Sequence, residues 1–393
     1  MTKQLKVDSV INLAGSGKPN FPVSPTSGGA ALSTLNTHSY TSSATEPSSP
    51  KNGAIWWDSA NSKVYVYANG EFKEITLNTD YPSAYTPAPS YLGPRGFMLG
   101  GNGSTTNMSY IDITTAGDAQ DFGDMIGAFS LFSAVGNGAR IVTMGGYNNS
   151  LSGTKQTNQI QYFASATTGD ASDFGDLTQA RDKTATVGDA TRAVCGGGGF
   201  SGAQNVMDYI TIANTGNATD FGDLTVARLY HGATNDATRG VYITGENGGY
   251  RNTMDYITTQ TAGNATDFGD VTTAVYGAHS GICADTTRGL YMGGIPQGVS
   301  YALNNIEYIT IQTTGNGTDF GDMNNGRSNV QACSDGTTGI IMGGFSYPTN
   351  SGTAEHIQKV TIQTLGNATD YGGDLLSASN HNQSGAGASG AAS

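Results

Sequence analysis

The chain has 393 residues, of which 57 are glycine, 12% are charged and 37% are hydrophobic. Glycine has roughly twice its usual share, and the Ala/Leu/Glu/Lys-rich helices of a bundle or a doubly wound α/β enzyme are missing. The formal net charge is −13 with no basic stripe, which argues against a nucleic-acid-binding surface. The composition therefore predicts an all-β protein with many short strands and Gly/Asn/Asp/Thr turns.

Residues 1–46 are polar and weakly patterned, and the stretch 24–49 is rich in Ser, Thr and Gly. Such a segment buries too little apolar area to fold alone, so we expect residues 1–46 to be an extended arm that docks on a partner surface. The chain shows neither the apolar run of a secretion signal nor one of membrane-spanning length. We therefore expect synthesis in a cytoplasm without membrane insertion.

Residues 47–78 are expected to form a small β-meander with three strands, at 54–57, 63–67 and 71–75. The dipeptide Asn69-Gly70 supplies the two positive-φ positions of a type I′ hairpin between the last two strands. Four prolines between positions 82 and 94 follow, and they predict a stiff linker over 79–94.

From about residue 91 the chain repeats. The tetrapeptide Asp-Phe-Gly-Asp begins at Asp121, Asp173, Asp220, Asp267 and Asp319, and a sixth copy with one insertion begins at Asp370. A period near fifty residues is typical of propeller blades. Each period resolves into four strand candidates: a small-residue run, an apolar strand ending in glycine, an alternating strand and the tetrapeptide strand.

The two ends of the repeat array indicate ring closure. The first period begins at Arg95 with its apolar strand, and the small-residue run 380–389 has no apolar strand after it. The C-terminal run can therefore supply the inner strand that the first period lacks, which removes the free edges of an open sheet. This predicts a six-bladed β-propeller over residues 95–393, closed by the C-terminal strand.

The repeat resembles the kelch repeat, whose unit has a small-residue inner strand, an apolar strand ending in a glycine pair, a third strand with a tyrosine and an outer strand. The glycine pairs are Gly100-Gly101, Gly145-Gly146, Gly293-Gly294 and Gly343-Gly344. The outer strand carries phenylalanine where kelch repeats usually carry tryptophan. The resemblance thus implies a divergent, kelch-like propeller.

The aromatic residue of each tetrapeptide is expected to pack between neighbouring blades. These residues are Phe122, Phe174, Phe221, Phe268, Phe320 and Tyr371. Spaced oxygens such as those of Asn217, Asp220 and Asp223 recur beside them and favour hydrogen-bonded turns, with one Ca²⁺ site per blade as the alternative. The Asn-x-Thr triplets at the same turns fit glycosylation acceptors by pattern only.

No nucleophile elbow, phosphate-binding loop or Cys/His metal spacing occurs in the sequence, so no catalytic residue, cofactor or metal is assigned and no enzyme is predicted. A central metal ring of His231, His279 and His381 remains an alternative. Variation is concentrated between the second and third strands of each period, where exposed aromatic and amide residues suit recognition, including stacking on sugars; ordinary loop drift is the alternative. The candidate recognition residues are Tyr147, Phe200, Tyr250, Arg251, Tyr301, Phe345 and Tyr347.

The 47–76 segment, with its P-x-x-P-x-N-G-x-I-W-W-D opening, resembles a module of tailed-phage virion proteins. The L-K-V-D-S-V opening and the A-T-D-F-G-D-L repeats resemble structural and fibre proteins of marine cyanobacterial phages. The resemblance implies a virion appendage whose residues 1–46 bind other virion proteins while the propeller contacts a host-surface glycan or protein, or further copies of the chain. The alternatives are a polysaccharide-degrading enzyme on a propeller scaffold and a bacterial surface lectin or adhesin.

Overall fold

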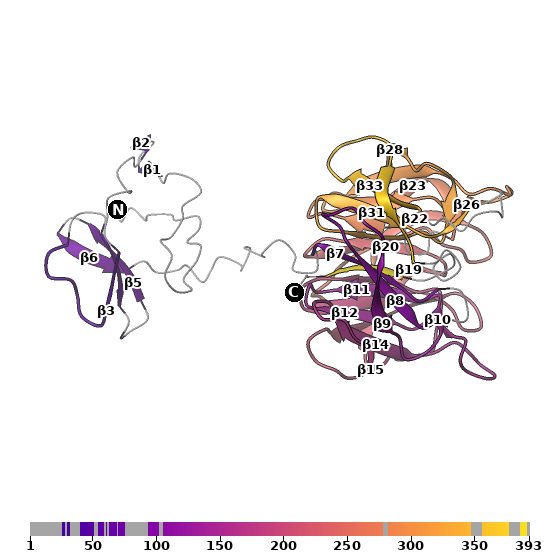
Figure 1. Cartoon of the computed structure of the whole chain (residues 1–393), viewed down its shortest axis with the longest axis horizontal. Coiled ribbons are helices and arrows are strands. Elements are labelled where there is room, and N and C mark those ends of the chain that lie inside the picture. Colours follow the sequence, from indigo (N-terminus) through magenta and orange to yellow (C-terminus); the bar gives the residue numbers. More distant parts are fainter. Residues whose placement is uncertain are drawn as a thin grey trace. The chain divides into compact units, whose positions relative to one another are not determined.

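The computed structural model describes residues 26–27, 30–31, 40–50, 54–58, 60, 63–68, 70–74, 93–101, 105–277, 282–346, 356–376 and 386–390. The chain divides into two compact units, Met1–Tyr85 and Thr86–Ser393. Within the described residues every regular element is a β-strand (Figure 1). The fold is therefore all-β, as the composition predicts.

The N-terminal unit contains a four-stranded sheet with the order β3-β4-β5-β6. Strands β4 (Ile55–Asp58), β5 (Lys63–Ala68) and β6 (Glu71–Glu74) form the antiparallel meander expected from the sequence. Strand β3 (Tyr40–Ser43) pairs parallel to β4 and comes from the segment predicted to be an extended arm. The sheet is thus one strand wider than the prediction. Two short strands, β1 (Thr26–Ser27) and β2 (Ala30–Ala31), pair with each other.

Trp56 holds this small sheet together. Its ring is buried, stacks on Tyr65 at a centroid distance of 4.9 Å and meets Phe72 edge-on at 5.3 Å. Its indole N–H donates to the carbonyl and hydroxyl oxygens of Ser43, each at 3.1 Å. Because a buried indole N–H needs an acceptor, the hydrogen bonds to Ser43 fasten β3 to the meander.

The second unit contains six antiparallel sheets, which are blades 1 to 6 in chain order. Five of them have four strands, and the sheet of blade 4 has β26 (Ile295–Pro296) as a fifth. The inner strands are β35 (Ala386–Gly390), β11 (Ser133–Gly136), β16 (Ala185–Gly188), β20 (Gly232–Asn235), β24 (Ile282–Ala284) and β30 (Gln331–Ser334). The second strands are β7 (Arg95–Leu99), β12 (Arg140–Met144), β17 (Arg192–Gly196), β21 (Arg239–Ile243), β25 (Arg288–Met292) and β31 (Thr338–Met342). The third strands are β8 (Asn107–Asp112), β14 (Gln159–Ala164), β18 (Gln204–Thr211), β22 (Arg251–Thr258), β27 (Asn305–Thr310) and β33 (His356–Thr361). The outer strands are β9 (Gln120–Asp124), β15 (Ser172–Asp176), β19 (Thr219–Arg228), β23 (Thr266–Tyr276), β28 (Thr318–Asp322) and β34 (Thr369–Asp374).

The C-terminal strand closes the ring. Strand β35 pairs antiparallel with β7, from Ala386 opposite Leu99 to Gly390 opposite Arg95. Each inner strand also contacts the inner strands of both neighbouring blades, so the six sheets surround one axis. This confirms the predicted six-bladed propeller, including its closure by the C-terminal segment.

The core of the propeller lies between the blades. Six clusters of buried hydrophobic residues each join two neighbouring blades, and each cluster contains one tetrapeptide aromatic. The ring centroid of Phe122 in blade 1, for example, lies 5.0 Å from that of Phe97 and 5.2 Å from that of Phe163 in blade 2. Burial of one such ring stabilises the interface by about 1.5–3 kcal/mol.

The tetrapeptide is also a backbone latch between blades. In blade 3, the Asp223 N–H donates to Asn264 Oδ1 of blade 4 at 3.0 Å, and the Gly263 N–H donates to the Phe221 carbonyl at 2.7 Å. Gly222 has a φ of +139°, and a Cβ there would lie 2.5 Å from the Gly263 backbone, so only glycine fits. The equivalent acceptors around the ring are Asp118, Asp170, Asn217, Asn264, Asn316 and Asn367.

An arginine clamp also joins neighbouring blades, at the start of the second strands. In blades 1 to 5 the first residue of the second strand is an arginine that stacks over the tyrosine of the third strand, at 4.2–4.7 Å from the ring centroid. Each arginine donates to backbone carbonyls of the next blade, as Arg239 does to Ile311. Blade 6 has Thr338 at this position, and there the Tyr371 hydroxyl bonds to the Asp112 and Thr115 carbonyls of blade 1.

Candidate recognition site on the loop face

We call one end of the propeller the loop face, because its surface is made by the second-to-third-strand loops and the outer-to-inner connections. An antiparallel meander places both kinds of segment at the same end. Three strand pairings join the loops to the connections. They are β10 (Phe129–Ser130) with β13 (Tyr147–Asn148), the end of β23 with β26 (Ile295–Pro296), and β29 (Arg327–Ser328) with β32 (Phe345–Ser346). The loops are therefore held by main-chain hydrogen bonds.

Each described outer-to-inner connection contains a left-handed residue ten positions after the first aspartate of the tetrapeptide. These residues are Leu131, Lys183, Tyr230, Gly277 and Asn329, with φ between +52° and +74°. Consecutive connections bond through them: the Lys183 N–H donates to the Leu131 carbonyl at 2.6 Å, and the Asn329 N–H to the Gly277 carbonyl at 2.5 Å. Non-glycine residues in this conformation are strained, and such strain is concentrated at functional sites.

Three tyrosines form a row across the loop face. Lys183 Nζ lies 5.2 Å from the Tyr230 ring centroid, Tyr230 meets Tyr276 edge-on at 5.8 Å, and Tyr276 lies 4.8 Å from Tyr250. Lys183 Nζ also lies 3.1 Å from both carboxylate oxygens of Asp182. Side chains of the connections between blades 2 and 3 and between blades 3 and 4 are thus linked with those of blade 4 into one continuous surface.

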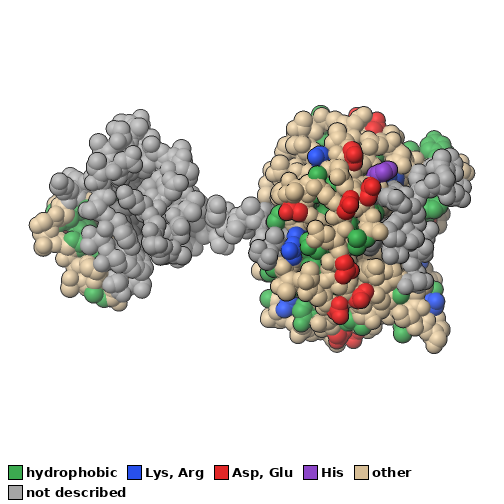
Figure 2. Space-filling model, in the orientation of Figure 1, with side chains coloured by type: hydrophobic (Ala, Val, Ile, Leu, Met, Phe, Trp, Pro, Cys, Tyr) green, Lys and Arg blue, Asp and Glu red, His purple; other side chains and the backbone are tan. Residues whose placement is uncertain are grey.

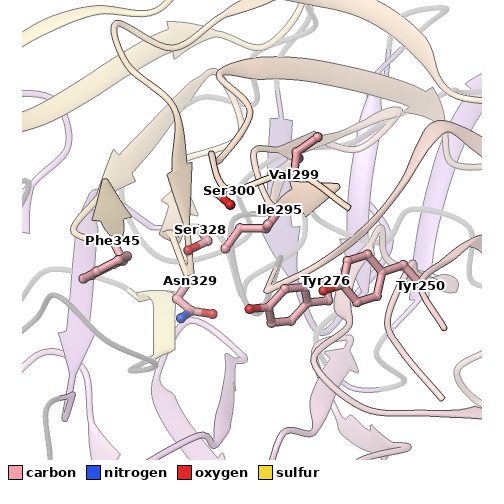
Figure 3. A pocket seen from close by; sticks show the side chains of 8 residues that line it. All are labelled: Tyr250, Tyr276, Ile295, Val299, Ser300, Ser328, Asn329 and Phe345. Carbon is pink, nitrogen blue, oxygen red and sulfur yellow. The ribbon is translucent and has the colours of Figure 1, made fainter. Parts of the chain in front are cut away.

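The row ends at a pocket of about 390 Å³ (Figure 3). The lining residues are Tyr250, Tyr276, Ile295, Val299, Ser300, Ser328, Asn329 and Phe345. Figure 3 shows the Tyr276 hydroxyl and the Asn329 carboxamide directed toward one another, with Phe345 on the far side of Asn329. The Asn329 Oδ1 atom is buried and has no hydrogen-bond partner in the protein. The pocket therefore combines aromatic walls with an unsatisfied polar group.

The electrostatics of this surface keep the phenols of Tyr230 and Tyr250 neutral. Burial raises the pKa of Tyr230 to about 12, and the carboxylates of Asp182 and Glu246 add to the rise. Burial, together with Tyr276 and Glu246, also raises the pKa of Tyr250. A neutral phenol is both a hydrogen-bond donor and a flat apolar surface at physiological pH. None of the eight residues that line the pocket carries a charge.

Buried arginines stabilise the outer-to-inner connections. Arg181 and Arg228 have fully buried side chains, and each pairs with an aspartate of the next blade: Arg181 Nη2 with Asp208 at 2.7 Å and Arg228 Nη2 with Asp255 at 2.5 Å. Arg327 holds the equivalent position in blade 5 and donates instead to Asn325 Oδ1 and to the carbonyls of Gly343 and His356. These contacts fix the backbone that carries the left-handed residues.

The seven recognition residues predicted from the sequence lie at different places. Tyr250 and Phe345 line the pocket. Tyr147 lies in β13 beneath Lys155, and Arg251 donates to the Asn247 carbonyl. The side chains of Phe200 and Tyr301 are about half exposed, at 53% and 50%, and do not line the pocket. Tyr347 lies outside the described residues.

Sequence analysis missed Tyr230, Tyr276, Lys183 and Asn329, which lie on the outer-to-inner connections rather than on the loops considered. A signal for Lys183, Tyr230 and Asn329 exists in the repeat. The position ten residues after the first aspartate of each tetrapeptide changes from Leu131 to Lys183, Tyr230, Gly277 and Asn329, whereas the tetrapeptide itself recurs. A position that varies inside a repeated frame indicates a surface role rather than packing.

Acidic side chains gather in a band on the propeller (Figure 2). The first aspartate of every tetrapeptide is exposed, as at Asp121, and so is the second aspartate in Asp124 and Asp374. In the described part of the chain no group of three or more His, Cys, Asp or Glu side chains is arranged to hold a metal ion. His231 is buried beside β20, and its two proposed partners, His279 and His381, lie outside the described residues.

Comparison with known protein families and with curated protein sequences finds no match to this chain. The described residues include no helix long and apolar enough to cross a membrane. The class of protein that the fold defines is a closed six-bladed β-propeller with an unrepeated pocket on its loop face.

Proposed function

We propose that the chain is a structural appendage of a tailed-phage virion, such as a tail-fibre-like or capsid-decorating protein. The N-terminal segment docks on the particle, and the propeller presents its loop face to the host surface. The observation that carries the proposal is the contrast between a scaffold whose blades are joined by repeated contacts and an aromatic pocket on its loop face, where the connection residues differ from blade to blade. A rigid scaffold with a variable site suits recognition.

The division of the chain supports this assignment. A compact N-terminal unit precedes the propeller, and its segment 47–76 resembles a module of phage virion proteins. All of the net negative charge lies after residue 90, because the first ninety residues contain six lysines against three aspartates and three glutamates. A neutral docking unit and an acidic outward-facing unit fit different partners.

The pocket favours binding over hydrolysis. A polysaccharide-degrading enzyme needs two carboxyl groups flanking the scissile bond. The eight lining residues include no carboxylate, and the two acidic residues of the adjacent tyrosine row, Asp182 and Glu246, have pKa values raised by burial. Asp182 is moreover bonded to Lys183. These features support a recognition role for the loop face.

Deletion of residues 1–39 tests the docking assignment, because it removes most of the expected arm but keeps β3 in its sheet. We expect particles purified from infected cells to carry the full chain and to lack the deletion variant, as measured by mass spectrometry. Tyr276→Ala in the full chain is the matched control and should be incorporated normally. Normal incorporation of a folded deletion variant, or absence of the full chain from particles, would contradict the proposal.

A further inference from the structure

The pocket has the two kinds of group that a pyranose sugar requires. Such a ring has an apolar C–H face and a rim of hydroxyl groups, so its site needs a flat aromatic surface beside hydrogen-bond donors and acceptors. Tyr250, Tyr276 and Phe345 supply aromatic surface, and Ser300, Ser328 and Asn329 supply hydroxyl and amide groups. A pocket of about 390 Å³ is within the range of small-ligand sites.

Tyr276 is held as a rigid platform. Its backbone pairs with Ile295 in the β23–β26 ladder, and its ring meets Tyr230 edge-on and lies at a centroid distance of 4.8 Å from Tyr250. A ring fixed before the ligand arrives loses little conformational freedom on binding. Tyr276 is therefore the residue of the pocket best placed to stack on a sugar.

Asn329 offers the polar contact. Its backbone is fixed by a φ of +52° and by the hydrogen bond to the Gly277 carbonyl, and its Oδ1 atom is buried without a partner. In either orientation of the amide, a hydrogen-bonding atom at this place lacks a partner within the protein. A buried unsatisfied polar group is destabilising, and a ligand hydroxyl would satisfy it.

Charge restricts the class of sugar. Of the nearby cations, Lys183 is paired with Asp182, Arg251 donates to the Asn247 carbonyl, and Arg327 donates to Asn325 and to the Gly343 and His356 carbonyls of blade 6. The carboxylate of Glu246 lies near Tyr250 and Tyr230, whose pKa values it raises. The eight residues that line the pocket supply no cation to pair with an acidic sugar, and the Glu246 carboxylate would repel it.

We propose that the pocket binds a neutral pyranose unit of a polysaccharide, stacked on Tyr276 and hydrogen-bonded to Asn329, and that it rejects the corresponding uronic acid. This inference rests on the proposed role of the loop face in host-surface contact, and it names the ligand of that same surface.

Titration calorimetry of the purified full chain tests this, with neutral oligosaccharides and matched counterparts that carry a carboxylate at C6. We expect at least one neutral sugar to bind and its uronate counterpart to bind about tenfold more weakly or not at all. Tyr276→Ala and Asn329→Ala should each weaken binding by about five- to tenfold, whereas Tyr276→Phe should retain most of it because the ring remains.

Tyr301→Ala is the matched control. Tyr301 is exposed on the blade 5 loop that also carries Val299 and Ser300, but it does not line the pocket. It should bind sugar like the unaltered chain, and circular dichroism checks that each variant is folded. Equal loss in Tyr301→Ala, preference for the uronate, or no binding of any neutral sugar at about 10 mM would overturn the inference.

Particle incorporation is scored separately from sugar binding. If particles carry the chain but the pocket variants bind normally, the inference fails and the proposed appendage role stands. If the purified chain binds neutral sugar through Tyr276 but is absent from particles, the appendage role fails and the pocket assignment stands.

Discussion

Tyr371 occupies the position that phenylalanine holds in the other five tetrapeptides. Its ring is buried in the cluster between blades 6 and 1, and its hydroxyl bonds to the Asp112 and Thr115 carbonyls of blade 1. The same interface lacks the arginine clamp, because blade 6 begins its second strand with Thr338. Two departures from the repeat thus compensate each other at the place where the ring closes.

Replacement Tyr371→Phe should lower the free energy of unfolding of the propeller by about 1–2 kcal/mol, because it leaves carbonyl oxygens at the closing interface without their donor. Chemical denaturation followed by circular dichroism measures the change. Tyr110→Phe is the matched control: its hydroxyl donates to Gln120 on the surface of one blade, so its loss should cost little. Equal effects of the two variants would refute a special role for the Tyr371 hydroxyl.

At the scale of strands and connections, the buried ion pairs join consecutive blades only in part of the ring. Arg228 pairs with Asp255, and the Asp255 carboxylate also accepts from the N–H and hydroxyl of Thr225. The next connection has Val275 at the position of Arg228, and there the Glu307 carboxylate accepts from the N–H and hydroxyl of Thr272 in the same way. The threonine contacts are thus the common element, and the arginine is an addition.

Replacement Arg228→Val should lower the free energy of unfolding by about 3 kcal/mol, because it leaves the buried Asp255 carboxylate without its cation. The double variant Arg228→Val/Asp255→Leu should recover part of the loss, since no buried charge remains. Urea denaturation of both variants measures the difference. A double variant less stable than the single one would show that the aspartate stabilises the blade mainly through Thr225.

The elements of the propeller were predictable because each scaffold contact recurs with the repeat. Phe221, Gly222 and Asn264 have equivalents in neighbouring blades, so the amino-acid pattern by itself indicates strand order and period. Strand β3 was not predictable in the same way: its sequence, Tyr-Thr-Ser-Ser, is short and polar, and it pairs parallel with a strand some fifteen residues away.

Only some of the residues that line the pocket were predictable from the sequence. Tyr250 and Phe345 lie on loops that the repeat identifies as variable, and they line the pocket. Tyr276 and Asn329 reach it because left-handed turns and short ladders bring the outer-to-inner connections against those loops. That convergence depends on how three blades pack, and no local pattern encodes it.

For the whole molecule, stability depends on the one strand that joins the two ends of the propeller. Without β35, strand β7 would have an unpaired edge, and the inner strands β30 and β11 would lose a neighbour that each of them contacts. The ring would then be an open array with an exposed apolar blade, the arrangement in which sheets pair with other chains.

A chain that ends at residue 385 should therefore melt at a much lower temperature than the full chain and should form oligomers in size-exclusion chromatography. A chain that ends at residue 390 keeps β35 and is the matched control, expected to match the full chain in both measurements. Both tryptophans lie in the N-terminal unit, so tryptophan fluorescence reports that sheet while circular dichroism reports mainly the propeller. We expect truncation to change the second signal and not the first. A truncated chain that stays monomeric and melts like the control would show that the five complete blades hold the ring without its closing strand.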